Sequence, residues 1–184
     1  MPSVTEIAAM CEAVLAVAAE PVSVDTLAAA AGEGVAVAEV ESAMELVRAR
    51  HEQDGSGLVV ERVGGGWRMA TRPELEGVLR GFLGVRARTR LSQAALETLA
   101  IVAYRQPITL PEVSFLRGVN SAGVLRTLLE RKLVKAAGRK QVVGTPLLYR
   151  TTREFLVHFG LDDLAALPAP EEAAEVGGDG TRGS

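Results

Sequence analysis

The 184 residues are 48% hydrophobic, which is enough for one large or two small domains with real cores. A net charge of −3 gives no overall signal for binding nucleic acid or a membrane surface. No segment approaches the roughly twenty apolar residues that a membrane span needs, and the N-terminus lacks the basic segment of a secretion signal. The single cysteine, Cys11, excludes an internal disulfide and favours a reducing, cytoplasmic location.

The charge changes sign along the chain. Residues 1–80 carry six Lys or Arg against thirteen Asp or Glu, whereas residues 91–160 carry ten against four. This division predicts two modules with different neighbours. We expect an N-terminal domain over residues 1–80, a linker over 81–90, a C-terminal domain over 91–167 and a disordered acidic tail over 168–184.

The first predicted element is an Ala-rich helix over residues 4–19. Its apolar residues recur at helical spacing and mark a broad buried face that includes Ile7, Cys11 and Leu15. Cys11 is far in sequence from both histidines and has no second cysteine to pair with. We therefore expect a packed thiol rather than a reactive one.

An internal repeat begins after this helix. Residues 20–27 match residues 106–113 position by position at an offset of 86. In both copies a hydroxyl residue, Ser23 or Thr109, precedes a helix and can accept a hydrogen bond from its first turn. Apolar residues on either side form a hydrophobic staple in each copy. The repeat predicts that the two halves of the chain share one fold.

The first copy continues through a helix over residues 35–50 and then a hairpin. Strands at residues 58–60 and 67–69 flank Gly64-Gly65-Gly66. We interpret these glycines as a hairpin loop, because no Lys-Ser/Thr follows them and they do not open a helix as a phosphate-binding loop would. Trp67 is expected to pack beneath the hairpin.

The densest helix signals lie between residues 91 and 160. Ser92 and Thr109 are predicted N-caps, and Thr109 forms a capping box with Glu112. Gly118 is predicted to end the second helix in the left-handed conformation. The remaining predicted features of this domain are a third helix starting at Asn120 or Ser121 and two strands at residues 133–135 and 147–149.

This order of elements predicts the fold class. Two helices joined by a tight Gly-containing turn, followed by a third helix and a hairpin, form a winged helix-turn-helix. Because the first half repeats the order, we expect a mainly α fold with small β-hairpins (α+β), built as two tandem winged helix-turn-helix domains.

Motifs for catalysis, cofactors and metals are missing from the sequence. His51 and His158 are distant from each other and from Cys11, which gives no metal-ligand spacing. No Gly-rich nucleotide loop, nucleophile elbow or paired-carboxylate motif occurs. We therefore expect no cofactor, no bound metal and no enzymatic activity.

Four runs in the second half occur in a fixed order. They are Leu91-Ser92-Gln93, Tyr104-Arg105-Gln106-Pro107-Ile108-Thr109, Leu128-Leu129-Glu130-Arg131, and Pro146-Leu147-Leu148-Tyr149. With these runs the second half resembles the segregation and condensation protein B family. The resemblance covers about seventy residues tightly, and the layout of residues 1–75 fits the family more loosely. Thr145 stands where the family usually has Arg, and Phe115 stands where a polar residue is common.

The resemblance implies a bacterial chromosome-organising subunit. Members of that family dimerise chiefly through the N-terminal winged helices and bind the central segment of an ScpA-like kleisin. Through the kleisin they regulate the SMC ATPase, to which the ATPase chemistry belongs. The implied location is cytoplasmic and nucleoid-associated. Residues predicted to contact the partner are Arg105, Gln106, Arg117, Asn120, Arg126, Arg131, Arg139 and Tyr149.

Charge supports protein contacts in the first domain and leaves an alternative open in the second. The helix over residues 35–50 carries Glu39, Glu41 and Glu45 where a DNA reader would carry basic residues. The basic residues of the second domain could meet phosphate or an acidic peptide, so a DNA-binding transcription regulator is the alternative hypothesis. In the favoured hypothesis, contact with DNA is indirect or weak.

Overall fold

The computed structural model describes residues 2–53, 55–84 and 91–169. The chain divides into two compact units, Met1–Thr89 and Arg90–Ser184. Most of the predicted linker and nearly all of the predicted acidic tail lie outside the described residues.

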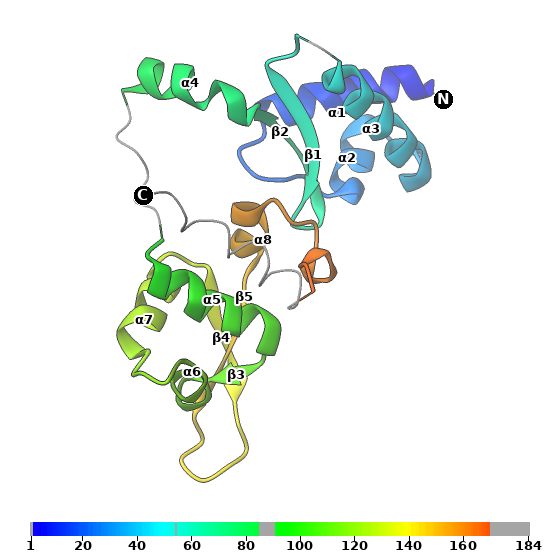
Figure 1. Cartoon of the computed structure of the whole chain (residues 1–184). Coiled ribbons are helices and arrows are strands. Elements are labelled where there is room, and N and C mark those ends of the chain that lie inside the picture. Colours follow the sequence, from blue (N-terminus) through cyan, green and yellow to red (C-terminus); the bar gives the residue numbers. More distant parts are fainter. Residues whose placement is uncertain (1, 54, 85–90, 170–184) are drawn as a thin grey trace. The chain divides into compact units, whose positions relative to one another are not determined.

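Unit 1 consists of three helices, a two-stranded hairpin and a fourth helix (Figure 1). In chain order these elements are α1 (Val4–Val17), α2 (Val24–Ala31), α3 (Val37–Glu52), β1 (Leu58–Val63), β2 (Gly66–Thr71), a 3-10 turn (Pro73–Leu75) and α4 (Glu76–Leu83).

Local capping explains where these helices begin. The Ser3 side chain accepts a bond from Glu6 N at the start of α1, and the Glu6 carboxylate accepts from Ser3 N in return. Ser23 caps α2 as the sequence predicts, accepting a bond from Thr26 N. Helix α3 begins at Val37, two residues later than predicted. Ala36, the residue before it, has no side chain that can cap the helix, and its backbone N–H donates to the Glu39 carboxylate.

The core of unit 1 lies between the helices and the hairpin. Cys11 is 1% exposed among apolar neighbours, and this burial raises the pKa of its thiol, in agreement with the predicted packed role. Trp67 is also 1% exposed, as predicted, and the Arg62 guanidinium lies 5.9 Å from the centre of its ring. Gly64 and Gly65 form the two-residue hairpin turn, both with the positive φ that such a turn requires.

Unit 2 repeats the plan and adds a short strand (Figure 1). Its elements are α5 (Gln93–Arg105), β3 (Ile108–Thr109), α6 (Leu110–Arg117), α7 (Ala122–Glu130), β4 (Val134–Arg139), β5 (Leu147–Thr151), α8 (Arg153–Phe159) and a 3-10 turn (Leu164–Ala166). The three strands form an antiparallel sheet in the order β3-β5-β4.

The predicted caps of unit 2 are present. Ser92 accepts from Ala95 N, and Thr109 and Glu112 form the reciprocal capping box. Gly118 ends α6 with φ of 69°. Helix α7 begins one residue after Ser121, whose side chain makes no capping bond to it.

The repeat is visible in the strand pairing of both units. Val22 forms an isolated antiparallel bridge with Trp67, just before α2. Ile108 pairs with Tyr149 at the corresponding place before α6. Each unit therefore has a helix, a short extended segment paired to the hairpin, two further helices and the hairpin itself. The fold is mixed α+β with two tandem winged helices, as predicted.

One element extends beyond its predicted end. Helix α4 runs to Leu83, three residues into the predicted linker over residues 81–90. Gly81 does not break the helix, whereas Gly84 follows it in the left-handed conformation with φ of 59°. The remaining linker residues lie outside the part of the chain that the structure describes.

Candidate functional site: an apolar groove on unit 2

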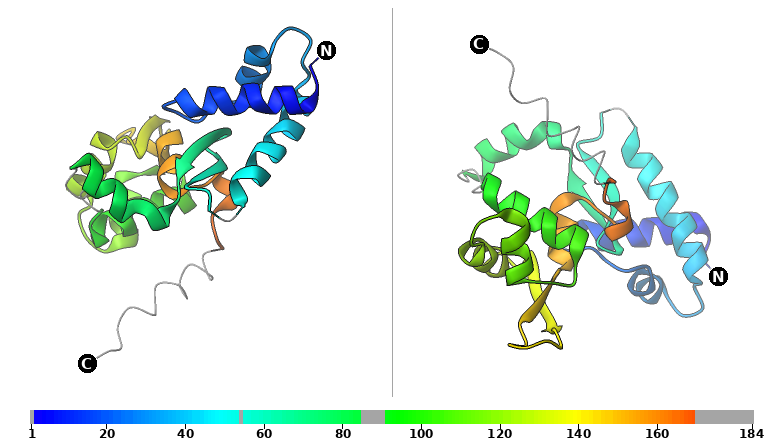
Figure 2. Two further views of the ribbon diagram at one scale, coloured as in Figure 1. Left: turned by 90° about the horizontal axis from the view of Figure 1, so that it is seen from above. Right: turned by 60° about the horizontal axis from the view of Figure 1, so that its bottom comes forward.

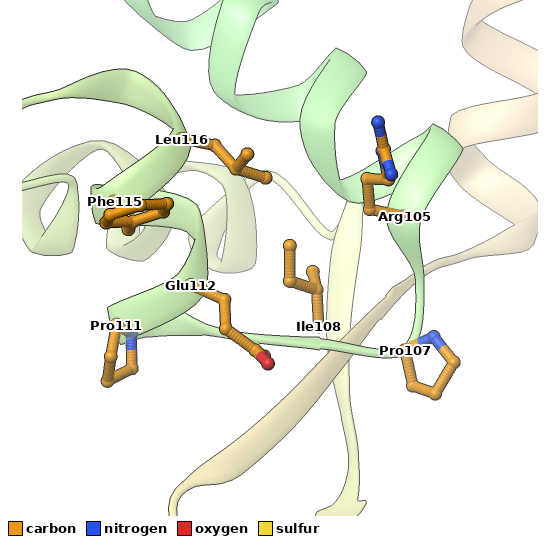
Figure 3. A pocket seen from close by; sticks show the side chains of 7 residues that line it. All are labelled: Arg105, Pro107, Ile108, Pro111, Glu112, Phe115 and Leu116. Atoms are coloured by element: carbon orange, nitrogen blue, oxygen red, sulfur yellow. The ribbon is translucent and has the colours of Figure 1, made fainter.

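A groove of about 460 Å³ opens on unit 2 between the end of α5, strand β3 and helix α6 (Figure 3). Arg105 lies on one side of it, Ile108 forms the floor, and Leu116 projects from the α6 side. The complete lining is Arg105, Pro107, Ile108, Pro111, Glu112, Phe115 and Leu116.

Long-range hydrogen bonds fix the floor and the α5 side. The Gln106 side chain accepts bonds from the Thr151 backbone N–H at 2.9 Å and the Thr151 hydroxyl at 3.0 Å. Its amide nitrogen donates to Ala103 O at 3.0 Å. These bonds hold the end of α5 against β5, while Ile108 pairs with Tyr149 in the sheet. The backbone around the groove is therefore held in place from both sides.

The α6 side of the groove exposes large apolar side chains. Phe115 is 85% exposed and Leu116 is 50% exposed, and Val119 beyond the helix end is 55% exposed. Single exposed apolar residues are common, but three within five residues at the edge of a groove form a patch of the kind that binds a protein partner.

Two charged residues, Glu112 and Arg105, line the groove, and they differ in whether the fold supplies a partner of opposite charge. Glu112 accepts hydrogen bonds from Lys140 and from the side chain and backbone of Thr109, which together lower the pKa of its carboxyl to about 2. Arg105 is exposed in the last turn of α5, and no acid among the described residues pairs with it. The groove thus combines an apolar surface with a positive charge, that of Arg105, which has no acidic partner among the residues that the structure describes.

Comparison with known proteins places the chain in a family. The sequence profile of the family described as "Segregation and condensation complex subunit ScpB" matches residues 9–170. The chain belongs to this family. A "Segregation and condensation protein B" from Moorella thermoacetica is 46% identical over 182 residues, covering 92% of this chain and 89% of that protein. Its counterpart from Myxococcus xanthus is 45% identical over 175 residues, covering 95% of this chain.

The chain spans about half the length of the Myxococcus xanthus relative, 52% of which is covered. Among solved structures, ScpB from Mycobacterium tuberculosis is 38% identical, covering 88% of this chain and 99% of that chain, with a TM-score of 0.42.

The residues that sequence analysis predicted as ScpB-type partner contacts do not come together at one place. Arg105 lines the groove, and Tyr149 supports its floor through the pairing with Ile108. Arg126 pairs with Glu130 on α7, and Arg139 donates to Thr145 O in the wing. The role of each as a partner contact stays a prediction.

Three others of these predicted residues also make bonds within the fold. Gln106 is occupied by Thr151 and Ala103, as described above. Arg117, whose side chain is 11% exposed, pairs with Glu97 at 2.8 Å and ties α6 to α5. The Asn120 side chain accepts from Ala122 N at the start of α7. Arg131 is the residue that ends α7.

Two groove residues, Phe115 and Leu116, were not among the predicted contacts of this ScpB-family chain. One signal for Phe115 is present in the sequence, because Phe115 departs from the polar residue common in the family. A helical apolar residue is normally assigned to the core from spacing alone, so its 85% exposure only became apparent with α6 in place.

A second hollow, of about 360 Å³, lies between α5 and α8 and has an apolar lining that includes Leu96, Leu99 and Phe159. The chain's own segment after α8 borders it, because Leu167 and Pro168 line it and Tyr104 Oη donates to Pro168 O at 2.7 Å. Elsewhere in the described residues, no three His, Cys, Asp or Glu side chains gather in a metal-binding group. None of the described helices is long and apolar enough to cross a membrane.

Proposed function

We propose that this chain is a non-catalytic subunit of an SMC–kleisin complex that supports chromosome condensation and segregation. It binds the central segment of an ScpA-like kleisin as a homodimer and reaches the SMC ATPase through that kleisin, in the cytoplasm at the nucleoid. The observation that carries this proposal is the match of residues 9–170 to a family of segregation and condensation complex subunits.

The groove on unit 2 is the proposed kleisin contact. Its apolar residues Phe115 and Leu116 can bury the apolar face of a helical or extended segment, which is how peptides dock in grooves. Arg105 can pair with an acidic residue of that segment, because no acid among the described residues of its unit pairs with it. The fitting segment is therefore apolar on one face with a carboxylate near one end.

The proposed dimer contact lies in unit 1. Helix α4 exposes Val78, Phe82 and Leu83, with exposed fractions of 71%, 86% and 63%. These residues lie on one side of the helix at i, i+4 and i+5 spacing, where a second copy of the chain can cover them.

Co-purification tests the kleisin proposal. The full chain is mixed with a kleisin central fragment and passed over a size-exclusion column, and we expect one complex. Phe115→Asp places a charge in the groove and should weaken binding about tenfold or more, which corresponds to ~1.4 kcal/mol. Because Phe115 is mostly exposed, the variant should fold normally, and circular dichroism checks this.

Val143→Asp provides the matched control. Val143 is a fully exposed apolar residue in the wing loop, away from the groove lining, so its replacement should leave kleisin binding unchanged. Separate elution of the unmodified chain and the fragment would refute kleisin binding. Equal loss in both variants would refute the assignment to the groove while leaving kleisin binding intact.

A further inference from the structure

Three acidic residues of unit 2 are engaged by particular basic residues. Glu97 pairs with Arg117, Glu112 with Lys140, and Glu130 with Arg126, as three separate ion pairs. Within residues 91–169, no acid lies within ion-pairing distance of Lys132, Lys135 or Arg150. These three side chains therefore carry positive charge that no acid of residues 91–169 neutralises directly.

Two of these cations face each other across the wing. Lys135 on β4 and Arg150 on β5 are direct partners in the antiparallel register, and both are exposed. Their neighbours in the register, Val134 and Thr151, are buried, so the two cations lie on the outer face of the hairpin. Like charges directly opposite each other destabilise a sheet, and no acid of residues 91–169 pairs with either cation to relieve this repulsion.

Lys132 extends the positive charge to the base of the hairpin. The Thr152 hydroxyl donates to Lys132 O at 2.6 Å, and Thr152 N donates to Leu133 O at 3.2 Å, which joins the two ends of the wing. Lys132 has φ of 58°, a left-handed conformation that glycine adopts at lower cost than any residue with a side chain. Lysine at this position therefore destabilises the fold relative to glycine. Backbone strain of this kind is found at functional sites, and binding of an anion by the Lys132 charge is such a function.

The part of β4 that follows Lys135 carries only small side chains before Arg139. Ala136, Ala137 and Gly138 follow Lys135 on β4, and all three are exposed. A stretch of such small residues offers no apolar anchor of the kind that protein partners bury, but it allows a polyanion backbone to approach closely. Figures 1 and 2 show the loop end of the β4–β5 hairpin extending away from the helices of its own unit.

We propose that Lys132, Lys135 and Arg150 form a cationic strip that binds the phosphate backbone of duplex DNA. The contact is independent of base sequence, because it uses the outer face of the wing rather than a helix placed in a groove. It differs from recognition through α7, where Arg126 is paired with Glu130. This inference does not depend on kleisin binding and would add a direct DNA contact to the proposed subunit.

Fluorescence anisotropy with labelled duplex DNA tests the strip in the full chain over a series of salt concentrations. We expect binding at low salt that weakens as salt rises. The double variant Lys135→Ala with Arg150→Ala should bind about tenfold more weakly and reduce the salt slope by about 2, which corresponds to two lost phosphate contacts. A probe of scrambled sequence should bind equally well.

Arg48→Ala with Arg126→Ala removes the same net charge from exposed ion pairs on α3 and α7 and serves as the control. This control should keep its affinity within about twofold. No DNA binding by the unmodified chain, unchanged binding by the strip variant, or an equal loss in the control would each overturn the proposal. The proposal would also be overturned if the unmodified chain preferred particular DNA sequences and the control lost that preference, because the contact would then lie on α7.

Lys132→Gly gives a second, independent readout. Glycine relieves the left-handed conformation, so this variant should melt at a higher temperature than the unmodified chain while binding DNA more weakly. If Lys132 does not contact DNA, Lys132→Gly should raise the melting temperature and leave DNA binding unchanged. That result would exclude Lys132 from the strip.

Discussion

At the scale of single residues, polar side chains in unit 2 join elements that are distant in sequence. Gln106 at the end of α5 receives two bonds from Thr151, and Arg117 on α6 pairs with Glu97 on α5. Glu112 belongs both to a local cap and to a contact with Lys140 in the wing. Because Glu112 also lines the groove, its charge links the stability of α6 to the shape of the proposed kleisin contact.

Glu112 makes the stability of unit 2 depend on pH in the acid range. Its carboxyl has a pKa of about 2 in the folded chain against an ordinary value of 4.5. A lowered folded pKa means that the stabilisation is complete above pH ~4.5 and is lost as the pH falls toward 2. We expect Glu112→Gln to lower the free energy of unfolding at neutral pH and to cost progressively less below pH ~4.5, as measured by urea unfolding.

Lys140→Met separates the two causes of that lowered pKa. The hydrogen bond from Lys140 is the largest single cause and the two from Thr109 follow it, so removing Lys140 should raise the pKa of Glu112 without abolishing the shift. The acid-induced loss of stability should still begin near pH ~4.5, but it should be smaller and should be complete at a higher pH than in the unmodified chain. A pH profile that is identical in the unmodified chain and in Glu112→Gln would contradict this assignment.

Residue-scale predictions from sequence succeed where the chemistry is local. Ser23, Ser92 and Thr109 are caps because each needs only the backbone three residues ahead. The partner of Gln106 lies 45 residues away, and no sequence pattern specifies that distance. Gln106 and Arg117 were therefore predicted as partner contacts, whereas the structure shows what each one bonds to inside the fold.

At the scale of secondary structure, the ends of helices depend on whether a glycine has a positive φ. Gly118 ends α6 with φ of 69°, while Gly123 lies inside α7 with open space around it and no positive φ. Glycine stabilises the first position, where other residues are strained, and destabilises the second, where the chain loses more entropy on folding.

This contrast predicts opposite effects for the same substitution. Gly118→Ala should destabilise unit 2 by about 1 kcal/mol, because alanine is strained in the left-handed conformation. Gly123→Ala should stabilise it by about 0.5 kcal/mol, since a Cβ meets no atom within 4 Å. Thermal unfolding of the two variants measures both effects, and the same sign of change in both would contradict the explanation.

Strand β3 shows where element prediction from sequence ends. Residues Ile108 and Thr109 were predicted only as the staple and cap of α6, and both functions are compatible with the two-residue strand that they also form. The strand exists because β5 lies beside it in register, which is a tertiary property. The groove depends on this pairing, so its floor could not be predicted even though α5 and α6 were.

At the scale of the whole molecule, one fold occurs twice with different surfaces. Unit 1 is acidic, and its α3 carries Glu41 and Glu45, paired with Arg62 and Arg48. Unit 2 is basic and presents the apolar groove and the cationic strip. A duplicated scaffold can thus serve two kinds of contact, because the buried positions maintain the fold while the exposed positions of each copy differ.

Helix α4 provides the test of the proposed dimer. Phe82 is 86% exposed, and a second copy that covers it would remove a large apolar surface from water. We expect light scattering coupled to size-exclusion chromatography to give twice the mass of one chain for the unmodified protein. Phe82→Glu should shift it to the mass of a single chain, because the charge would have to be buried.

Val17→Glu is the matched control, since Val17 is 85% exposed at the end of α1, outside the α4 face. A dimer that persists in Phe82→Glu would move the interface away from α4 and leave the proposal of a homodimer intact, whereas a single-chain mass for the unmodified protein would refute the homodimer itself.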